Sequence, residues 1–265
     1  MMKRAGVLGS PIAHSLSPVL HRAAYRALDL DWAYDAYEVT EWELPAFVAE
    51  LDGTWAGLSL TMPLKSCVIP LLDSVDEVAA MVTSVNTVLP RDGGWHGTNT
   101  DIDGIVAAVR PHLDRTPAVA TVIGTGVTAR SVIAALGRLG IGRARVVGRR
   151  PEAVESILGL AEQLGIEAQG AECAPGPDLL GSELVVSTLP GAEGGAWAPH
   201  AGRATGVLLD VSYHPWPSPL ARAWPGERIA SGRDMLLWQA VEQVRLMTGR
   251  EAPVAAMEAA LRLEG

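Results

Sequence analysis

The chain has 265 residues, which is enough for one large domain or two of ordinary size. Its residues are 48% apolar and its formal net charge is −9, so it can bury a core, while its acidic surface argues against nucleic acid and an anionic membrane face as partners. No run approaches the roughly 20 apolar residues of a membrane-spanning helix, and Pro11 and His14 interrupt the N-terminal apolar run too early for a signal peptide.

The first hundred residues alternate short apolar strands with helices. We expect strands at residues 5–10, 32–39, 57–63 and 86–90, and helices at 17–28, 42–51 and 76–85. In the first helix Ser17 is the expected N-cap, and Pro18 takes the first helical position. Polar side chains follow several strands, at the ends where α/β folds bind their ligands. Taken singly, each has an ordinary explanation as a cap, a turn residue or a solvated lysine. These residues are Ser15, Ser17, Thr61, Lys65, Asn86 and Asp101.

After about Asp101 the pattern becomes that of a parallel sheet covered on both faces. An amphipathic helix at 102–113 precedes nearly continuous apolar strands at 118–126, 144–148, 183–190 and 206–213, with helices after the first two. Two helices, at 233–249 and 253–264, end the chain without a following strand. We therefore predict two α/β domains: residues 1–101 plus 239–265, and a Rossmann-type domain of residues 102–238, with the C-terminal helices packing back on the first domain.

The strand at 118–126 ends in a G-x-G-x-x-A pattern formed by Gly124, Gly126 and Ala129. In such a loop the first glycine permits a tight turn, the second lets the backbone approach a pyrophosphate, and the third small residue lets helix and strand pack closely. The phosphates then bind at the N-terminus of the following helix. Because this loop follows a strand and opens a helix, we prefer a dinucleotide site to a merely tight turn.

The end of the next strand indicates which dinucleotide binds. An NAD site usually places an acidic residue about 20 residues after the glycines, where it bonds the ribose 2′-OH. Here Arg149 and Arg150 stand at the strand end, and the first acidic residue after them is Glu152. Two guanidinium groups suit a 2′-phosphate, which favours NADP; a pair of solvated surface arginines is the alternative.

Five segments together resemble the shikimate dehydrogenase family: GSPIAHSLSPVLH, LTMPLK, SVNT, NTD and MLLWQA, in this order. The resemblance runs from about Gly6 to the C-terminus. It implies an NADP-dependent oxidoreductase that reversibly reduces 3-dehydroshikimate to shikimate, on the route to chorismate and the aromatic amino acids. The first domain would bind the substrate, the Rossmann domain would bind NADP, and the active site would lie in the cleft between them.

The same resemblance implies roles for individual residues. Lys65 and Asp101 match the catalytic pair, in which an ammonium group stabilises the developing alkoxide and delivers a proton while the carboxylate fixes its position. Ser15 and Ser17 match two serines that bind the substrate carboxylate. The residues implied to bind substrate are Ser15, Ser17, Thr61, Lys65, Asn86, Asp101, Tyr213 and Gln239. The residues implied to bind the cofactor are Gly124, Thr125, Gly126, Val127, Thr128, Ala129, Arg149, Arg150, Thr188, Gly232 and Met235.

The segments on the cofactor side depart from the family's usual ones. Ser187-Thr188-Leu189, for example, replaces the usual Asn-Ala-Thr. Two alternatives therefore stand beside the main interpretation: a quinate/shikimate-type dehydrogenase that uses NAD, and a non-catalytic ligand-binding relative. We expect small-molecule partners, no metal and a cytoplasmic location, since Cys67 and Cys173 form no C-x-x-C pattern. The sequence predicts no particular oligomeric state.

Overall fold

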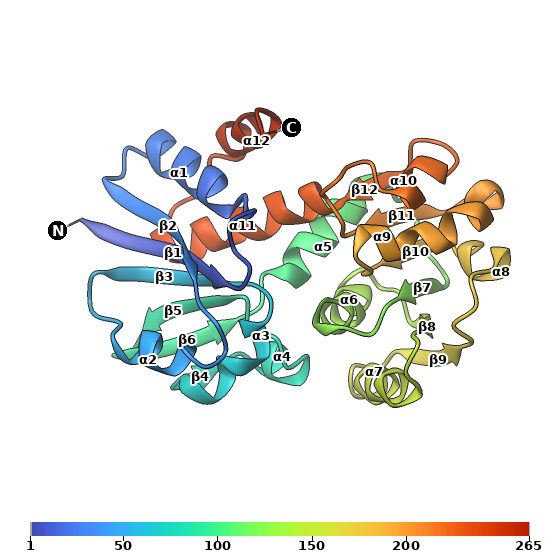
Figure 1. The fold of residues 1–265 in the computed structure, drawn as a ribbon, viewed down its shortest axis with the longest axis horizontal. Coiled ribbons are helices and arrows are strands. Elements are labelled where there is room, and N and C mark those ends of the chain that lie inside the picture. The colour runs from blue at the N-terminus through green and yellow to red at the C-terminus, as the bar shows by residue number, and fades with distance from the viewer. Residues whose placement is uncertain (1, 265) are drawn as a thin grey trace. The chain divides into compact units, whose positions relative to one another are not determined.

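The computed structural model describes residues 2–264, which fold as two compact units. The first unit comprises the residues up to Asp101 together with those from Leu236 onward, and the second comprises Ile102–Met235. Each unit is built on its own sheet with helices against it (Figure 1). The predicted fold class is therefore confirmed.

The sheet of the first unit has six strands in the order β2-β1-β3-β5-β6-β4. Strand β5 is antiparallel to both of its neighbours, and the other pairings are parallel. As a result, the carboxyl ends of β1, β3 and β6 share one edge of the sheet with the amino end of β5. The strands are β1 (Lys3–Gly9), β2 (Trp32–Glu38), β3 (Trp55–Leu60), β4 (Ser74–Val75), β5 (Thr87–Arg91) and β6 (Gly94–Thr98).

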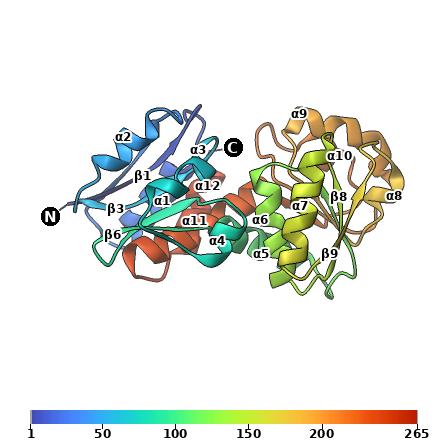
Figure 2. The same cartoon turned by 90° about the horizontal axis from the view of Figure 1, so that it is seen from below.

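Helices α1 (Ser17–Ala27) and α12 (Val254–Arg262) lie side by side, as both views show (Figures 1 and 2). They share one apolar core with β1 and with α11 (Gly232–Thr248), to which Leu20, Val244 and Met257 contribute. The two C-terminal helices thus pack on the first unit as predicted. A second core, with Leu58 and Leu64 in it, includes residues of the remaining helices. These are α2 (Leu44–Ala49), α3 (Leu64–Cys67), the 3₁₀ helix η1 (Ile69–Leu71) and α4 (Glu77–Met81).

The prediction that Ser17 caps α1 is wrong. Leu16 occupies the N-cap position with helical backbone angles, φ −89° and ψ −1°, and Ser17 is the first residue of the helix, with its side chain buried. The hydroxyl of Ser15 accepts a long hydrogen bond of 3.4 Å from the Ser17 N–H. The Ser17 hydroxyl makes no cap bond to the helix and lies near the buried Tyr34 hydroxyl.

The sheet of the second unit has six parallel strands in the order β12-β11-β10-β7-β8-β9. The chain runs outward from β7 to β9, returns to β10 beside β7, and runs outward in the opposite direction. This reversal creates a switch point between β7 and β10, where open α/β sheets form a ligand-binding crevice. The strands are β7 (Ala120–Ile123), β8 (Arg143–Val147), β9 (Glu167–Ala171), β10 (Leu184–Ser187), β11 (Val207–Asp210) and β12 (Ile229–Ser231).

Helices cover both faces of this second sheet. The pair α6 (Val127–Arg138) and α7 (Pro151–Gln163) lies on one face, and α9 (Gly191–Gly194), η3 (Gly195–Arg203) and α10 (Pro219–Ala223) lie together on the other (Figures 1 and 2). The remaining elements are α5 (Asp101–Val109), η2 (Arg110–His112) and α8 (Pro177–Leu180). Across residues 2–264, no helix has the length and apolar character needed to cross a membrane.

Candidate active site and cofactor site

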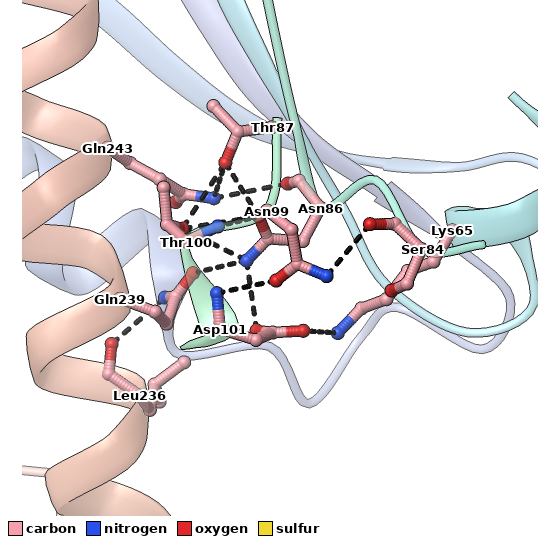
Figure 3. Close-up of polar contacts among 10 residues, drawn as sticks. All are labelled: Lys65, Ser84, Asn86, Thr87, Asn99, Thr100, Asp101, Leu236, Gln239 and Gln243. Carbon is pink, nitrogen blue, oxygen red and sulfur yellow. Dashed lines mark hydrogen bonds and ion pairs between the residues drawn. The ribbon is translucent and has the colours of Figure 1, made fainter. Parts of the chain in front are cut away.

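Three of the polar residues singled out above meet at the edge of the first sheet. Lys65 is in α3, just after β3; Asn86 directly precedes β5; and Asp101 follows β6. Lys65 Nζ donates to Asp101 Oδ2 at 2.5 Å, and Asn86 Nδ2 donates to Asp101 Oδ1 at 2.9 Å (Figure 3). Each oxygen of the carboxylate therefore has its own donor.

The ion pair between Lys65 and Asp101 is largely removed from water. The Lys65 side chain is 16% exposed and that of Asp101 only 6%. Charges attract more strongly in such surroundings than at the surface, and removing one partner leaves the other buried without compensation. The ammonium group has three N–H donors, so Lys65 can hold Asp101 and still donate to a ligand oxygen.

Asn86 is the centre of the hydrogen bonds around this pair. Its Oδ1 accepts from the Thr100 N–H at 2.7 Å and from Thr87 Oγ1 at 2.8 Å. Its Nδ2 donates, besides Asp101, to Thr100 Oγ1 at 3.0 Å and to Gln239 Oε1 at 3.3 Å (Figure 3). Gln239 lies on α11, 153 residues further along the chain, so α11 brings its amide to the sheet edge.

Ser15, Ser17 and Thr61 lie at the neighbouring strand ends. Ser15 and Ser17 follow β1, and Thr61 follows β3; the two segments are joined by backbone hydrogen bonds from Thr61 N to Leu8 O at 2.9 Å and from Ser10 N to Met62 O at 3.0 Å. Ser15 and Thr61 are partly exposed, whereas Ser17 is buried. The same sheet edge therefore presents hydroxyl groups as well as the Lys65–Asp101 pair.

Tyr213 belongs to the second unit, on the loop after β11. It is half-buried, and burial raises the pKa of its hydroxyl. The loop begins at the buried Asp210, whose carboxylate accepts from the Ser212 N–H at 3.1 Å and from Ser218 Oγ at 2.5 Å. Ser218 in turn caps α10, so Asp210 fixes both ends of the segment that contains Tyr213.

The second unit contains a pocket of about 670 Å³ at its switch point. Gly124 lines this pocket and has φ +107°, a backbone conformation that glycine adopts readily and other residues rarely adopt. Gly126 precedes the first residue of α6, and a Cβ there would meet nothing within 4 Å, so the backbone is open to a ligand. Thr125 lies between these glycines, and Thr188, from the end of β10, closes the opposite wall, where its Oγ1 donates to Ile123 O at 3.0 Å.

Arg149 and Arg150 line this pocket at the end of β8. The Arg149 guanidinium forms an ion pair of 3.1 Å with Glu193 of α9, which lines the same pocket. Free N–H groups at the start of α6 and two guanidinium groups fit a pyrophosphate and a 2′-phosphate. Glu193 competes with such a phosphate for Arg149.

Five other residues expected at the cofactor lie outside the lining of this pocket. Val127, Thr128 and Ala129 form the first turn of α6, where the fully buried Ala129 lets the helix pack on the sheet. Gly232 and Met235 belong to the first turn of α11, and Met235 is buried.

Gln243 and Glu193 are not among the residues predicted from the sequence. Gln243 is a polar residue four positions after Gln239, on the same face of a helix that packs into an apolar core, and this spacing is the signal that was available. For Glu193 the motif GAEGG after the strand at 183–190 gave no indication of a contact with Arg149, because the two residues come from different β–α connections.

The fold and these two sites define a class of protein: a two-unit α/β protein with a Rossmann-type sheet that has a pocket at its switch point, and a buried ion pair at the edge of the other sheet. Residues 7–88 match the model of the shikimate dehydrogenase substrate binding domain, and residues 232–262 match that of the shikimate 5′-dehydrogenase C-terminal domain. The chain belongs to the shikimate dehydrogenase family.

Individual relatives agree with this assignment. The shikimate dehydrogenase (NADP⁺) of Synechococcus sp. (strain JA-2-3B'a(2-13)) is 36% identical over 96% of this chain and 93% of its own length. The crystal structure of Mycobacterium tuberculosis shikimate dehydrogenase is 39% identical, with a TM-score of 0.92 over 99% of this chain and all of that one. The Thermus thermophilus enzyme, in complex with NADP(H) and shikimate, is 32% identical, with a TM-score of 0.84 over 99% of both chains.

Proposed function

We propose that this protein is an NADP-dependent shikimate dehydrogenase, which reversibly reduces 3-dehydroshikimate to shikimate on the route to chorismate and the aromatic amino acids. The observation on which the proposal rests is the buried Lys65–Asp101 pair at the edge of the first sheet. Family membership and relatives described as NADP⁺-dependent support the substrate and the cofactor. In this proposal, residues 1–101 plus 239–265 bind the substrate and residues 102–238 bind NADP.

Lys65 would be the general acid of the reduction. Bound NADPH supplies the hydride that converts the ketone to an alcohol. The Lys65 ammonium stabilises the negative charge that develops on the ketone oxygen and delivers a proton to it; in the reverse direction Lys65 takes that proton back. Asp101 holds Nζ at 2.5 Å and so fixes where the proton is delivered.

The hydroxyl groups around this pair would orient the substrate. Ser15 and Ser17 donate to its carboxylate, since hydroxyl-to-carboxylate hydrogen bonds are short and charge-assisted. Thr61, Asn86 and Gln239 bond the ring hydroxyl groups, and Tyr213 is the remaining residue proposed to bind the substrate. Asn86 and Gln239 are already oriented by the bonds around Asp101, so little side-chain entropy is lost when the substrate binds.

The glycine-rich loop and the first turn of α6 would hold the pyrophosphate of NADP, with Arg149 and Arg150 on the 2′-phosphate. One observation favours a second candidate, a quinate/shikimate-type enzyme that uses NAD. The Glu193 carboxylate faces the same pocket, where it can repel a 2′-phosphate or accept from a ribose 2′-OH.

The protein would act in the cytoplasm on small molecules. Its two cysteines, Cys67 and Cys173, are both free thiols, and a reducing compartment preserves that state.

The test mixes purified protein with shikimate or quinate, each with NADP or NAD, and follows formation of the reduced nicotinamide. We expect shikimate with NADP to have the highest kcat/KM, at least about tenfold above shikimate with NAD, which corresponds to about 1.4 kcal/mol. Equal efficiency with the two cofactors, or a preference for NAD, would favour the second candidate. Absence of turnover with every pair would exclude both enzymes and leave a ligand-binding relative.

A further inference from the structure

The first unit contains a buried network of uncharged polar side chains centred on Gln243, which the proposed function does not use. Gln243 is 1% exposed and lies on α11 one turn after Gln239. It connects three other elements to α11: α1 through His21, β3 through Ser59 and β5 through Thr87.

Every hydrogen-bonding position of the Gln243 amide is used. Oε1 accepts from Ser59 Oγ at 2.8 Å and lies 3.1 Å from His21 Nε2. Nε2 donates to Thr87 Oγ1 at 2.9 Å and to the backbone oxygen of Asn86 at 3.1 Å (Figure 3). An amide offers two donors and accepts two hydrogen bonds on its oxygen, so this side chain has a single satisfied orientation.

The direction of each bond determines that of the next. Tyr34 donates to Ser59 Oγ at 2.7 Å, and Ser59 uses its one proton on Gln243 Oε1. On the other side, Thr87 Oγ1 accepts from Gln243 Nε2, and because Asn86 Oδ1 can only accept, Thr87 gives its one proton to that oxygen at 2.8 Å. That bond, with the one from the Thr100 N–H, leaves Asn86 Nδ2 directed at Asp101.

His21 completes the network as an uncharged donor. It is fully buried and stacks on Tyr34 with ring centroids 4.0 Å apart. Burial lowers the pKa of His21 to about 3, so the ring is neutral at physiological pH. Since Gln243 Oε1 can only accept, the proton of the neutral ring is on Nε2.

We propose that Gln243 is a positioning residue for the reaction: it fixes α11 against β3 and β5 so that Gln239 and Asn86 converge on Asp101, and through Asp101 on Lys65. This inference rests on the proposed function. The apolar core can hold α11 in place but tolerates small rotations and shifts. A fully satisfied buried amide admits one arrangement, because any other leaves donors or acceptors unpaired.

Two variants test the proposal. Gln243→Met keeps the approximate shape but removes every hydrogen bond of the amide. We expect kcat/KM for shikimate to fall about 10- to 100-fold, in line with buried polar groups left unsatisfied, and the Kd of NADP, measured by calorimetry, to stay unchanged. Unchanged shikimate kinetics in a folded Gln243→Met protein would overturn the proposal.

Gln243→Glu adds a readout that a merely structural role would not move. An ionised carboxylate cannot donate to Thr87 or to the Asn86 backbone, whereas a protonated one regains a donor. The ratio of kcat/KM in this variant to that in the wild type should therefore rise as the pH is lowered. A ratio that is constant with pH would contradict the proposal.

The matched control is Met257→Ala, which truncates a fully buried side chain of the same core at a residue that is not part of the hydrogen-bond network. It should lower the melting temperature yet change shikimate kinetics by less than about twofold; a loss of kcat/KM equal to that of Gln243→Met would show general loosening instead. The side-chain amide NMR signals of Asn86 and Gln239 test the positioning role of Gln243 separately from the proposed function. These signals should shift in the ligand-free Gln243→Met protein and not in Met257→Ala. This result is expected even if the wild type does not oxidise shikimate and the proposed function is wrong.

Discussion

Lys65 and Asp101 show how one buried pair can serve both structure and chemistry. Asp101 is fixed by Asn86 on one oxygen and by Lys65 on the other, so the carboxylate does not depend on Lys65 alone for its position. Lys65 is tied in turn through its backbone, where the Val85 N–H donates to Lys65 O at 2.8 Å. The segment before β5 therefore fixes the main chain of Lys65 and also contains Asn86, which bonds Asp101.

Replacing Lys65 by Ala should lower kcat for shikimate by about 10²–10⁴-fold, the usual contribution of general acid–base catalysis. The Kd of NADP should be nearly unchanged, because the residue belongs to the first unit. Lys3→Ala is the control: Lys3 is the other lysine of the sequence, and its Nζ bonds Gly53 O at an exposed position. Asp101→Asn should also lower kcat severely. The double variant should have a kcat little lower than that of the more impaired single variant, because the two residues act as one unit. Near-normal turnover in Lys65→Ala would eliminate the mechanism.

Ser15→Ala and Ser17→Ala test the carboxylate site. Each should raise KM for shikimate, with a loss of about 1.5–3 kcal/mol for one charge-assisted hydrogen bond, and leave NADP binding unchanged. Because Ser17 makes no cap bond to the helix, its replacement should not cost the roughly 1 kcal/mol of a lost N-cap. Steady-state kinetics with thermal melting distinguish these effects. A drop in stability with normal KM would instead mean that Ser17 has only a structural role.

At the scale of elements, the residues proposed to distinguish NADP from NAD follow the carboxyl ends of β8 and β10. Arg149 and Arg150 come from the end of β8, and Glu193 comes from α9, which follows β10. The Arg149–Glu193 ion pair is largely exposed, at 77% and 44%, so water screens it and its strength is modest. A 2′-phosphate can therefore displace Glu193 at small cost.

Glu193→Gln should increase affinity for NADP by about two- to fivefold and leave affinity for NAD unchanged, since an exposed ion pair contributes up to about 1 kcal/mol. Replacing Arg149 and Arg150 together by Ala should have the opposite effect and weaken the binding of NADP far more than the binding of NAD. Binding titrations with each cofactor measure both, and Glu162→Gln, an exposed position near the far end of α7, is the control. If Glu193→Gln instead weakens the binding of NAD, Glu193 accepts a hydrogen bond from the ribose, and the enzyme is the second candidate, which uses NAD.

The strands that could be predicted are those in which apolar and polar residues alternate, or in which apolar residues form a continuous run. Strands β1, β3, β7, β10 and β11 are buried over most of their length, and their apolar runs predicted them. Strand β9 was missed because it lies at the sheet edge with exposed residues, and β6 because its sequence, GWHGT, has two glycines and no apolar run. Strands β4 and β12 were missed because two or three residues form no pattern. Their positions depend on neighbours that come from elsewhere in the chain.

The candidate site was predictable to the extent that short motifs define it. Lys65, Asn86 and Asp101 stand in motifs that resemble one family, and the structure brings them into contact. Gln243 stands in no such motif, and its bonds to Ser59 and Thr87 span 184 and 156 residues. Local sequence cannot indicate contacts of that range, which depend on how α11 packs.

At the scale of the whole molecule, His21 connects stability to pH. Its pKa is about 3 when buried, against 6.5 in an unfolded chain, so between these values the unfolded state binds more protons. The contribution of His21 to stability is thus fully present above pH 6.5 and is lost as the pH falls toward 3. The side chains that it contacts, Gln243, Tyr25 and Tyr34, are uncharged at neutral pH, so none of them offsets the effect.

The free energy of unfolding should therefore decrease more steeply between pH 7 and pH 5 in the wild type than in His21→Gln. Urea unfolding at both pH values gives the two differences, and comparison between the proteins cancels the contribution of the carboxylates. His112→Gln, which replaces a histidine in η2 of the second unit, is the control. If the free energy of unfolding changes equally with pH in the wild type and in His21→Gln, the His21 ring accepts a proton while the protein stays folded.

The first unit is made of two stretches of chain, separated by the whole of Ile102–Met235. A ribosome must therefore synthesise the entire second unit before Leu237, Ala240 and Val244 emerge to cover β1 and α1. The core between β1, α1 and α11 stays incomplete until these residues arrive, so we expect the second unit to complete its fold first, in the reverse of the order of synthesis. A nascent chain stalled after Met235 should show slow hydrogen exchange in β7 to β12 and rapid exchange in β1 to β6; protection of both sheets would mean that the first unit needs no C-terminal helix to fold.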